Sequence, residues 1–139
     1  YESATSHQVT VRVIDAGGEV FDKSLTISLI DVNDNAPVFT SSAAPSVAEN
    51  ITAVVTLLAH DPDTAGGPVS FAITGGADSG LFQIVSGNQL AFIAGHDYET
   101  QAHTYHFDVT ASDGNPSNDA VQSLIVTLTL QASVCSTLR

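Results

Sequence analysis

The sequence predicts an all-β protein, a sandwich or barrel of short antiparallel strands, and three observations support this class. Residues that favour strands, namely Val, Ile and Thr, are frequent, whereas Met and Trp are absent. Apolar and polar residues alternate with a period of two in several segments, and no helical period extends over about 11 residues. Turn sequences such as 16–18, 65–68 and 113–116 separate these segments, as is typical of sandwiches and barrels.

The strands predicted from this alternation follow one another along the chain as 9–13, 25–29, 55–59, 104–111 and 124–130. In the segment 104–111, one face carries only apolar side chains, and these are Tyr105, Phe107, Val109 and Ala111. Because successive side chains of a strand point to opposite faces, this face is predicted to lie on the core. The segment 124–130 shows the same pattern and is predicted to pair with it.

An internal repeat organises the chain. Tyr1-Glu2 recurs as Tyr98-Glu99, and the strand and turn at 11–17 recur at 109–114, which gives a repeat of about 98 residues. We therefore predict three parts, listed here in order: residues 1–35, the C-terminal part of a preceding repeat with its linker; residues 36–131, one complete repeat; and residues 132–139, a tail. Two isolated strands are marginal in water. We therefore expect the partial repeat to form a hairpin that packs on the complete repeat or on another molecule, as a dimer.

The linker sequence Asp-Val-Asn-Asp-Asn-Ala-Pro is the most specific feature of the chain. Its residues Asp31, Asn33, Asp34 and Asn35 place several oxygens on a short stretch, and Pro37 prevents a helix. Oxygen-only ligands suit a hard cation such as Ca²⁺. The alternative interpretation is an Asx-rich turn, in which these side chains hydrogen-bond their own backbone.

Further acidic residues support the metal interpretation, because they also lie at strand ends, where a sandwich gathers its loops. They are Glu2, Glu49, Asp61, Asp63, Asp97, Glu99 and Asp113. The chain has 15 acidic and 3 basic residues, so its formal net charge is −12. Clustered carboxylates would repel one another, and a divalent cation would offset them. The same charge argues against a nucleic-acid partner, which needs Lys and Arg at phosphates, and against docking on an anionic membrane.

The sequence does not indicate an enzyme. His103 and His106 are three residues apart on a predicted strand, so they project to opposite faces and cannot easily share a zinc ion. Neither a Gly-x-Ser-x-Gly elbow nor a phosphate-binding loop is present. Asp61 and Asp63 could mimic the carboxylate pair of a glycosidase, but a pair spaced by proline at a strand end fits Ca²⁺ better.

Together, these motifs resemble the cadherin repeat over nearly the whole chain, from Tyr1 to Leu130. The matching segments are 31–37, 48–50, 61–63, 97–99 and 111–114, with 71–76, 82–84 and 86–90 similar to the third strand, the fourth strand and the turn that follows it. One departure is Ala48, which stands where the family has Pro.

The resemblance implies a seven-stranded Greek-key β-sandwich of the cadherin or immunoglobulin type, preceded here by two strands of a partial repeat. It also implies Ca²⁺ ions that stiffen the junction between repeats. The implied junction ligands are Glu2, Asp31, Asn33, Asp34, Asn35, Asp61, Asp63 and Asp113. Glu49, Asp97 and Glu99 would form an incomplete site at the far pole, since no second linker sequence follows. We expect Ca²⁺ binding near the millimolar end of extracellular modules.

The function implied by the resemblance is that of a rigid structural and adhesive module in an extracellular cell-adhesion protein, membrane-associated or secreted, with homophilic contact. Expected partners are neighbouring repeats, another adhesin molecule or a cell-surface polysaccharide. A Ca²⁺-dependent carbohydrate-binding module is the alternative. Sugar sites usually offer exposed aromatic rings, whereas most of the 6 Phe and 3 Tyr residues fall on predicted core faces.

Overall fold

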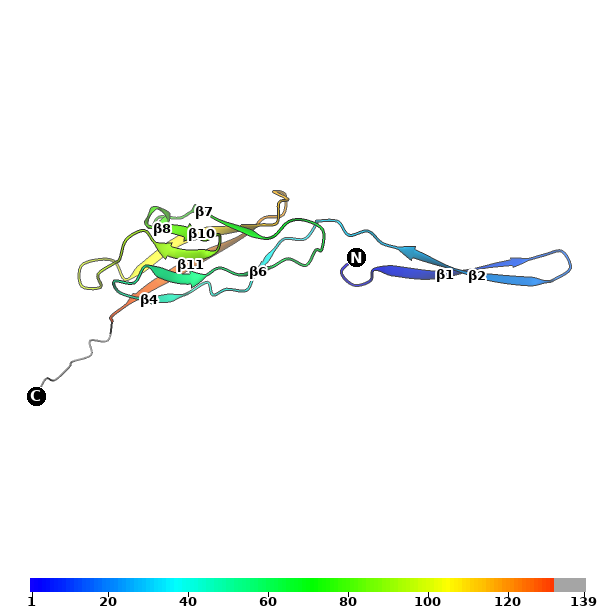
Figure 1. Cartoon of the computed structure of the whole chain (residues 1–139), viewed down its shortest axis with the longest axis horizontal. Helices are drawn as coiled ribbons and strands as arrows, with labels where there is room; N and C mark the ends of the chain where they lie inside the picture. Colours follow the sequence, from blue (N-terminus) through cyan, green and yellow to red (C-terminus); the bar gives the residue numbers. More distant parts are fainter. Residues whose placement is uncertain (132–139) are drawn as a thin grey trace, which may run out of the picture.

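The computed structural model describes residues 1–131, which form a long hairpin and a β-sandwich joined by an extended linker (Figure 1). The predicted all-β class is confirmed, because these residues hold strands, one short 3-10 helix, η1 (Ser79–Leu81), and no α-helix. No helix among them is long and apolar enough to cross a membrane. The predicted tail, 132–139, lies outside the described residues.

The sandwich is built from short strands in two layers (Figure 1). Their bounds are β3 (Val38–Phe39), β4 (Ser46–Ala48), β5 (Ala53–Thr56), β6 (Ala59–His60), β7 (Ser70–Gly75), β8 (Phe82–Val85), β9 (Gln89–Phe92), β10 (Thr104–Ser112) and β11 (Ala120–Thr129). One sheet has the order β4-β11-β10-β7, another the order β5-β9-β8, and β3 pairs with β6. All pairs are antiparallel except that of β4 with β11.

These nine segments correspond to the seven strands that were predicted, because two strands are interrupted. The stretch 38–48 pairs first with β6, through β3, and then with β11, through β4. The stretch 53–60 breaks between β5 and β6, at the buried Leu57 and the exposed Leu58. A register shift between Ala53 and Val55 marks a bulge in the same strand. The sequence predicted 55–59 as one uninterrupted strand, because alternation alone does not reveal a bulge.

The core lies between the two layers and contains a cluster of aromatic rings. The ring of Phe82 stacks on those of Phe92 and Phe107, with centroids 4.4 and 4.1 Å apart. Tyr105 packs edge-on against Phe92. All four apolar residues predicted to face the core from β10 are buried, so that prediction is confirmed. Each fully buried side chain of this size stabilises the fold by about 1.5–3 kcal/mol.

The hairpin consists of β1 (Ser6–Ile14) and β2 (Val20–Ser28), and every residue of both strands is exposed. Its register pairs Val9 with Leu25 and Val13 with Phe21, so one face is mostly apolar, with Lys23 opposite Val11 near its middle. The other face is mostly polar and carries an ion pair between Arg12 and Asp22, at 2.7 Å. The hairpin extends away from the sandwich (Figure 1), so the first of the two expected arrangements, packing on the complete repeat, is not found, whereas packing on another molecule stays a prediction.

The linker explains this direction. It leaves the hairpin as an extended segment, and its last residue, Pro37, is fully buried in the sandwich. Because the linker is extended and fixed at one end, it carries the hairpin outward instead of folding it back. The apolar face of the hairpin therefore has no counterpart within residues 1–131.

Candidate metal centre

Acidic side chains from distant parts of the sequence meet at the pole of the sandwich where the linker arrives. One group consists of Asp61, Asp63 and Asp113, which lie in the loops after β6 and after β10. A second group consists of Glu2, Asp31 and Asp63. In each group, one oxygen of every carboxylate lies within 4.8 Å of the others. Asp63 belongs to both groups, so the two groups form one continuous acidic centre.

The linker backbone fixes Asp63, which is only 8% exposed. One carboxylate oxygen, Oδ2, accepts the backbone N–H groups of Asp34 and Asn35, at 2.9 and 2.8 Å. The other, Oδ1, accepts the side-chain amide of Asn35 at 2.6 Å. These bonds, and above all the backbone N–H of Asn35, hold the pKa of Asp63 below its ordinary value, so the group is ionised at neutral pH.

Asp31 uses one oxygen to hold the loop that follows β6. Its Oδ2 accepts the hydroxyl and the backbone N–H of Thr64, both at 2.5 Å, and the backbone N–H of Ala65 at 2.8 Å. The Thr64 hydroxyl is the main cause that lowers the pKa of Asp31. Its other oxygen, Oδ1, is buried and accepts no hydrogen bond.

Asp113 is arranged in the same way and is only 2% exposed. Its Oδ1 accepts the backbone N–H of Asn115 at 2.8 Å, whereas its Oδ2 is buried without a partner. An unpaired charged oxygen in a buried place is unfavourable unless a cation or a donor reaches it. Asp31 and Asp113 thus each have one oxygen fixed by the protein and one oxygen that a hard cation would satisfy, so these residues fit Ca²⁺.

The remaining predicted linker residues differ from one another. The side-chain oxygen of Asn33 is also buried and unpartnered, so it adds a third oxygen of this kind. Asp34 belongs to neither acidic group, and its Oδ1 accepts the side-chain amide of Asn35 at 2.9 Å. That amide nitrogen already donates to two carboxylates, so Asn35 holds acidic side chains in place here.

Two further residues, Asn115 and Asn118, hold this centre together and were not predicted from the sequence. Their side-chain amides donate to backbone carbonyls of the linker. The corresponding turn of the partial repeat, 15–19, contains no asparagine. The internal repeat therefore did not indicate these two asparagines. Their contacts also join residues more than 80 positions apart, which a local sequence pattern does not reveal.

The three acidic residues predicted at the far pole also lie together, with one oxygen each within 4.8 Å. Both oxygens of Glu49 accept backbone N–H groups, from Gln131 at 3.0 Å and from Tyr98 at 3.3 Å. Asp97 accepts the backbone N–H of Glu99 at 2.9 Å. In this group, therefore, the carboxylates of Glu49 and Asp97 are already hydrogen-bonded to the backbone.

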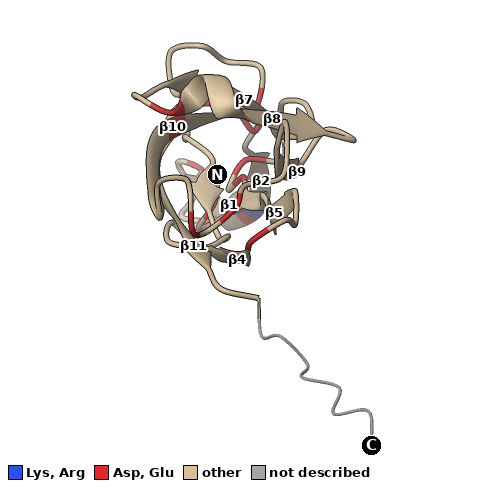
Figure 2. Cartoon of the chain, turned by 90° about the vertical axis from the view of Figure 1, so that its left-hand side faces the viewer, with Lys and Arg blue, Asp and Glu red and all other residues tan. Residues whose placement is uncertain are grey.

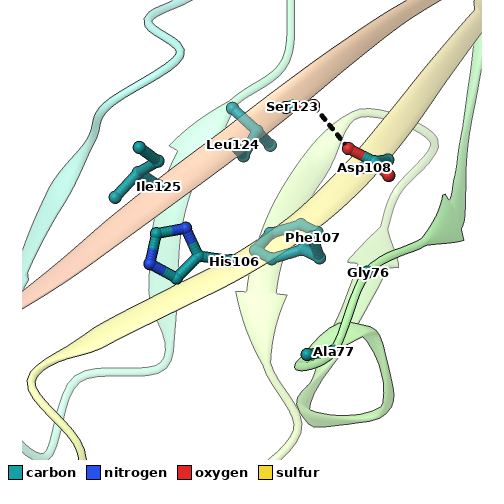
Figure 3. Close-up of a pocket in the computed structure, with 8 residues that line it drawn as sticks. All are labelled: Gly76, Ala77, His106, Phe107, Asp108, Ser123, Leu124 and Ile125. Carbon is teal, nitrogen blue, oxygen red and sulfur yellow. Dashed lines mark hydrogen bonds between the residues drawn. The ribbon is translucent and has the colours of Figure 1, made fainter.

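A separate hollow of about 310 Å³ lies on the outer face of β10 and β11 (Figure 3). His106 and Asp108 line it, and Asp108 accepts the hydroxyl of Ser123 at 2.6 Å. The phenyl ring in its lining belongs to Phe107, which is only 2% exposed, so it offers no flat aromatic surface. None of the acidic groups described above lies in this hollow.

The fold and the acidic pole define a class, that of β-sandwich modules joined to a neighbour through an acidic linker. The chain belongs to the bacterial Ig domain family, whose model matches residues 33–129. The relatives and solved structures that it resembles are cadherins, so the chain is also a cadherin repeat, as the resemblance in the sequence implied. Cadherin repeats are adhesion modules without catalytic activity, and they bind Ca²⁺.

Protocadherin Fat 4 of Mus musculus is 36% identical over 118 residues, which is 80% of this chain and 2% of that protein. Protocadherin gamma-A4 of Homo sapiens is 36% identical over 137 residues, 91% of this chain and 14% of that protein. The crystal structure of human CDH23 EC21-23 has a TM-score of 0.73 at 26% identity, with 92% of this chain and 45% of that chain covered. The Protocadherin gammaB7 EC3-6 cis-dimer structure has a TM-score of 0.76 at 26% identity, covering 92% of this chain and 34% of that chain. The chain thus spans a small part of the length of the curated relatives that it matches.

Proposed function

We propose that this chain is a Ca²⁺-binding junction of a multi-repeat, extracellular adhesion protein. In this proposal, residues 36–131 are a complete repeat, and residues 1–35 are the end of the preceding repeat with its linker. The observation that carries the proposal is the pair of buried carboxylate oxygens without partners, on Asp31 and Asp113. Both belong to acidic groups that share Asp63.

A bound cation would supply positive charge that no Lys or Arg side chain of residues 1–131 supplies in the sandwich, since Arg12 and Lys23 lie on the hairpin. Asp61, Asp63 and Asp113 would hold one ion, and Glu2, Asp31 and Asp63 would hold another. Glu2 precedes β1, on the hairpin side, whereas Asp63 follows β6, in the sandwich. A shared ion would therefore tie the hairpin to the sandwich and fix the angle between them. Without the ion, the same carboxylates repel and the junction bends.

Thermal unfolding with Ca²⁺ and with EDTA tests this proposal. For a site of millimolar affinity, a tenfold excess of Ca²⁺ stabilises the protein by about 1.4 kcal/mol, and this raises the melting temperature by roughly 5 °C. The shift should be absent in a variant that carries both Asp61→Asn and Asp63→Asn.

Asp108→Asn is the matched control, because it also removes an acid, lies outside both groups and still accepts the Ser123 hydroxyl. It should keep the full Ca²⁺ shift. If the wild-type chain melts at the same temperature in Ca²⁺ and in EDTA, the proposal is wrong. An equal shift with Mg²⁺ would likewise exclude a site built for the larger ion.

We further propose that the assembled protein acts in cell adhesion, with a second copy as its partner. This proposal rests on the family alone, and bead aggregation that requires Ca²⁺ would test it. The hollow on β10 and β11 does not favour polysaccharide binding, since it lacks an exposed phenyl or phenol ring.

A further inference from the structure

The loop 113–119, between β10 and β11, contacts the linker through two asparagine side chains. The amide nitrogen of Asn115 donates to the backbone carbonyl of Asn33 at 2.9 Å. The amide nitrogen of Asn118 donates to the backbone carbonyl of Asn35 at 2.6 Å. The donor and the acceptor are 82 positions apart in the first bond and 83 positions apart in the second, so both bonds form only when the repeat is folded.

The two carbonyls are spaced as in a strand, where carbonyls two residues apart point to the same side. The loop thus takes the place of a neighbouring strand, with side-chain amides as donors. It is itself braced by backbone hydrogen bonds. The N–H of Asn115 donates to Asp113 at 2.8 Å, and the N–H of Ser117 donates to the side chain of Asn115 at 3.2 Å. A braced loop can hold a neighbouring segment without first losing its own freedom.

Two backbone N–H groups of the linker point to the acidic centre. The backbone N–H groups of Asp34 and Asn35 both donate to Asp63, the carboxylate shared by the two acidic groups. The linker therefore lies between a set of acceptors and a set of donors. Gly66, with φ +110°, leaves room for the side chain of Asn33, because a Cβ at this position would lie 2.6 Å from its Nδ2 atom.

We propose that Asn115 and Asn118 are positioning residues, which hold the linker in its cation-binding conformation before any cation arrives. This inference rests on the proposed Ca²⁺ site. If the linker were free, only a fraction of the chains would hold it in the cation-binding conformation at any time. The apparent Kd for Ca²⁺ would then equal the intrinsic Kd divided by that fraction, so the affinity would be lower. Two hydrogen bonds, each towards the lower end of the ordinary range of net strength, change such a fraction by about tenfold.

The alternative role for Asn118 is that of a ligand, because its side-chain oxygen is buried without a partner. A ligand acts only when the ion is present, whereas a positioning residue acts also in its absence. The two roles therefore differ in what they do to the linker in EDTA.

The test is amide hydrogen exchange at Asp34 and Asn35 in EDTA, together with a calorimetric titration with CaCl₂. In the variant with Asn115→Ala and Asn118→Ala, we expect these two amides to exchange about tenfold faster and the Kd for Ca²⁺ to rise about tenfold. Amides of the core strand β10 should keep their protection, which a general loss of stability would remove.

Asn88→Ala is the matched control, because Asn88 also donates its side-chain amide to a backbone carbonyl, that of Leu57, away from the linker. It should change neither quantity. Asn118→Ala alone keeps the turn that Asn115 braces, and it should give a smaller change in the same direction if the double variant does not fold.

Unchanged exchange of Asp34 and Asn35 in EDTA would overturn the positioning role, whatever happens to the affinity. A raised Kd with unchanged exchange would instead identify Asn118 as a ligand. Because exchange is measured without Ca²⁺, it tests the inference even if the wild-type chain binds no Ca²⁺, an outcome that would refute only the proposed function.

Discussion

Single oxygen atoms determine the properties of the acidic centre before any ion binds. Asp113 is almost fully buried, yet only its Oδ1 receives a hydrogen bond. Asp31 is divided in the same way between a bonded oxygen and a free one. A buried charge without a partner destabilises the ion-free fold, whereas the same oxygen contributes favourably once a cation reaches it. The charge of these residues therefore destabilises the ion-free protein and stabilises the ion-bound protein.

This opposition gives a prediction for Asp113→Asn. The amide oxygen can still accept the backbone N–H of Asn115, but the unpartnered charge is removed. In EDTA, the variant should melt at the same temperature as the wild type or at a higher one. Its free energy of unfolding should exceed that of the wild type by up to about 1–3 kcal/mol. In Ca²⁺, the stabilising shift should be lost. A variant that melts clearly lower in EDTA would mean that the charge is compensated in the ion-free state.

The pH dependence of linker docking depends on Asp31. The Thr64 hydroxyl and nearby backbone N–H groups hold the pKa of Asp31 below its ordinary value. A lowered pKa in the folded state contributes stability above the unfolded-state pKa, near 4, and this contribution is lost as the pH falls through the folded-state value. In EDTA, the linker should therefore stay docked from pH 7 to about 4 and be released only in more acidic solution.

Chemical shifts of the Thr64 and Ala65 amides, followed by NMR against pH, measure this release. In Asp31→Asn, the transition should disappear. A wild-type transition centred at pH 5 or higher would contradict the lowered pKa of Asp31.

At the scale of strands, the sequence predicted best where one face alone is buried. In β10, strict alternation identified Tyr105, Phe107, Val109 and Ala111, and all four are buried. It failed where the pairing changes within one stretch, as between β3 and β4 and between β5 and β6. Those changes depend on which strand lies alongside, and this is a long-range property that a local pattern does not contain.

The same limit applied to the acidic centre. The carboxylates were predictable, since acids at strand ends are visible in the sequence and loops of a sandwich gather at its poles. Asn115 and Asn118 were not, because their function depends on carbonyls of the linker, and any residue type supplies a carbonyl. Of the two arrangements predicted for the hairpin, packing on the complete repeat is not found (Figure 1) and packing on another molecule stays a prediction, because an apolar face indicates that something covers it but not what does.

The hairpin β1–β2 gives a prediction of its own. Its mostly apolar face includes Val9, Val11, Leu25 and the paired residues Val13 and Phe21, all of them exposed, with Lys23 opposite Val11. Exposed apolar side chains gathered on one face favour association. We therefore expect the chain to self-associate as its concentration rises, in sedimentation velocity experiments. Val11→Thr with Leu25→Thr should reduce this association, because Thr keeps the strand propensity and removes apolar area.

Thr10→Ser with Thr26→Ser on the polar face is the control and should leave self-association unchanged. A chain that sediments as a monomer at every concentration would refute the prediction. A longer chain that continues upstream through a whole repeat should instead be monomeric, if its added strands cover the same face.

The charge of the whole molecule is distributed unevenly. In the part of the chain that the structure describes, the basic residues are Arg12 and Lys23, and both lie on the hairpin (Figure 2). The predicted complete repeat, 36–131, therefore contains acidic side chains but neither Lys nor Arg. No ion pair with Lys or Arg can form within it, so its carboxylates repel one another through solvent.

This repulsion predicts a dependence on salt. Raising NaCl from about 50 to 500 mM shortens the Debye length to a few ångströms and screens the repulsion. The melting temperature in EDTA should rise by a few degrees. The increase of the melting temperature with NaCl should be smaller in Asp108→Asn, which carries one charge less. Melting that is independent of NaCl would mean that the carboxylates are too far apart to interact. Ca²⁺ should raise the melting temperature at a far lower concentration than NaCl does, because it binds at defined positions.

The hydrogen bonds of the linker also determine where the chain would yield under tension. Asp31 is bonded to Thr64 and Ala65, the backbone of Asp34 and Asn35 is bonded to Asp63, and two asparagines hold the carbonyls. On the hairpin side, Glu2 is the residue that belongs to the acidic centre. A pulling force applied along the molecule would therefore break the contacts of Glu2 first and straighten the chain between β2 and the linker, while the linker stays docked on the sandwich. By mechanical strength, the linker belongs to the module that follows it in the chain.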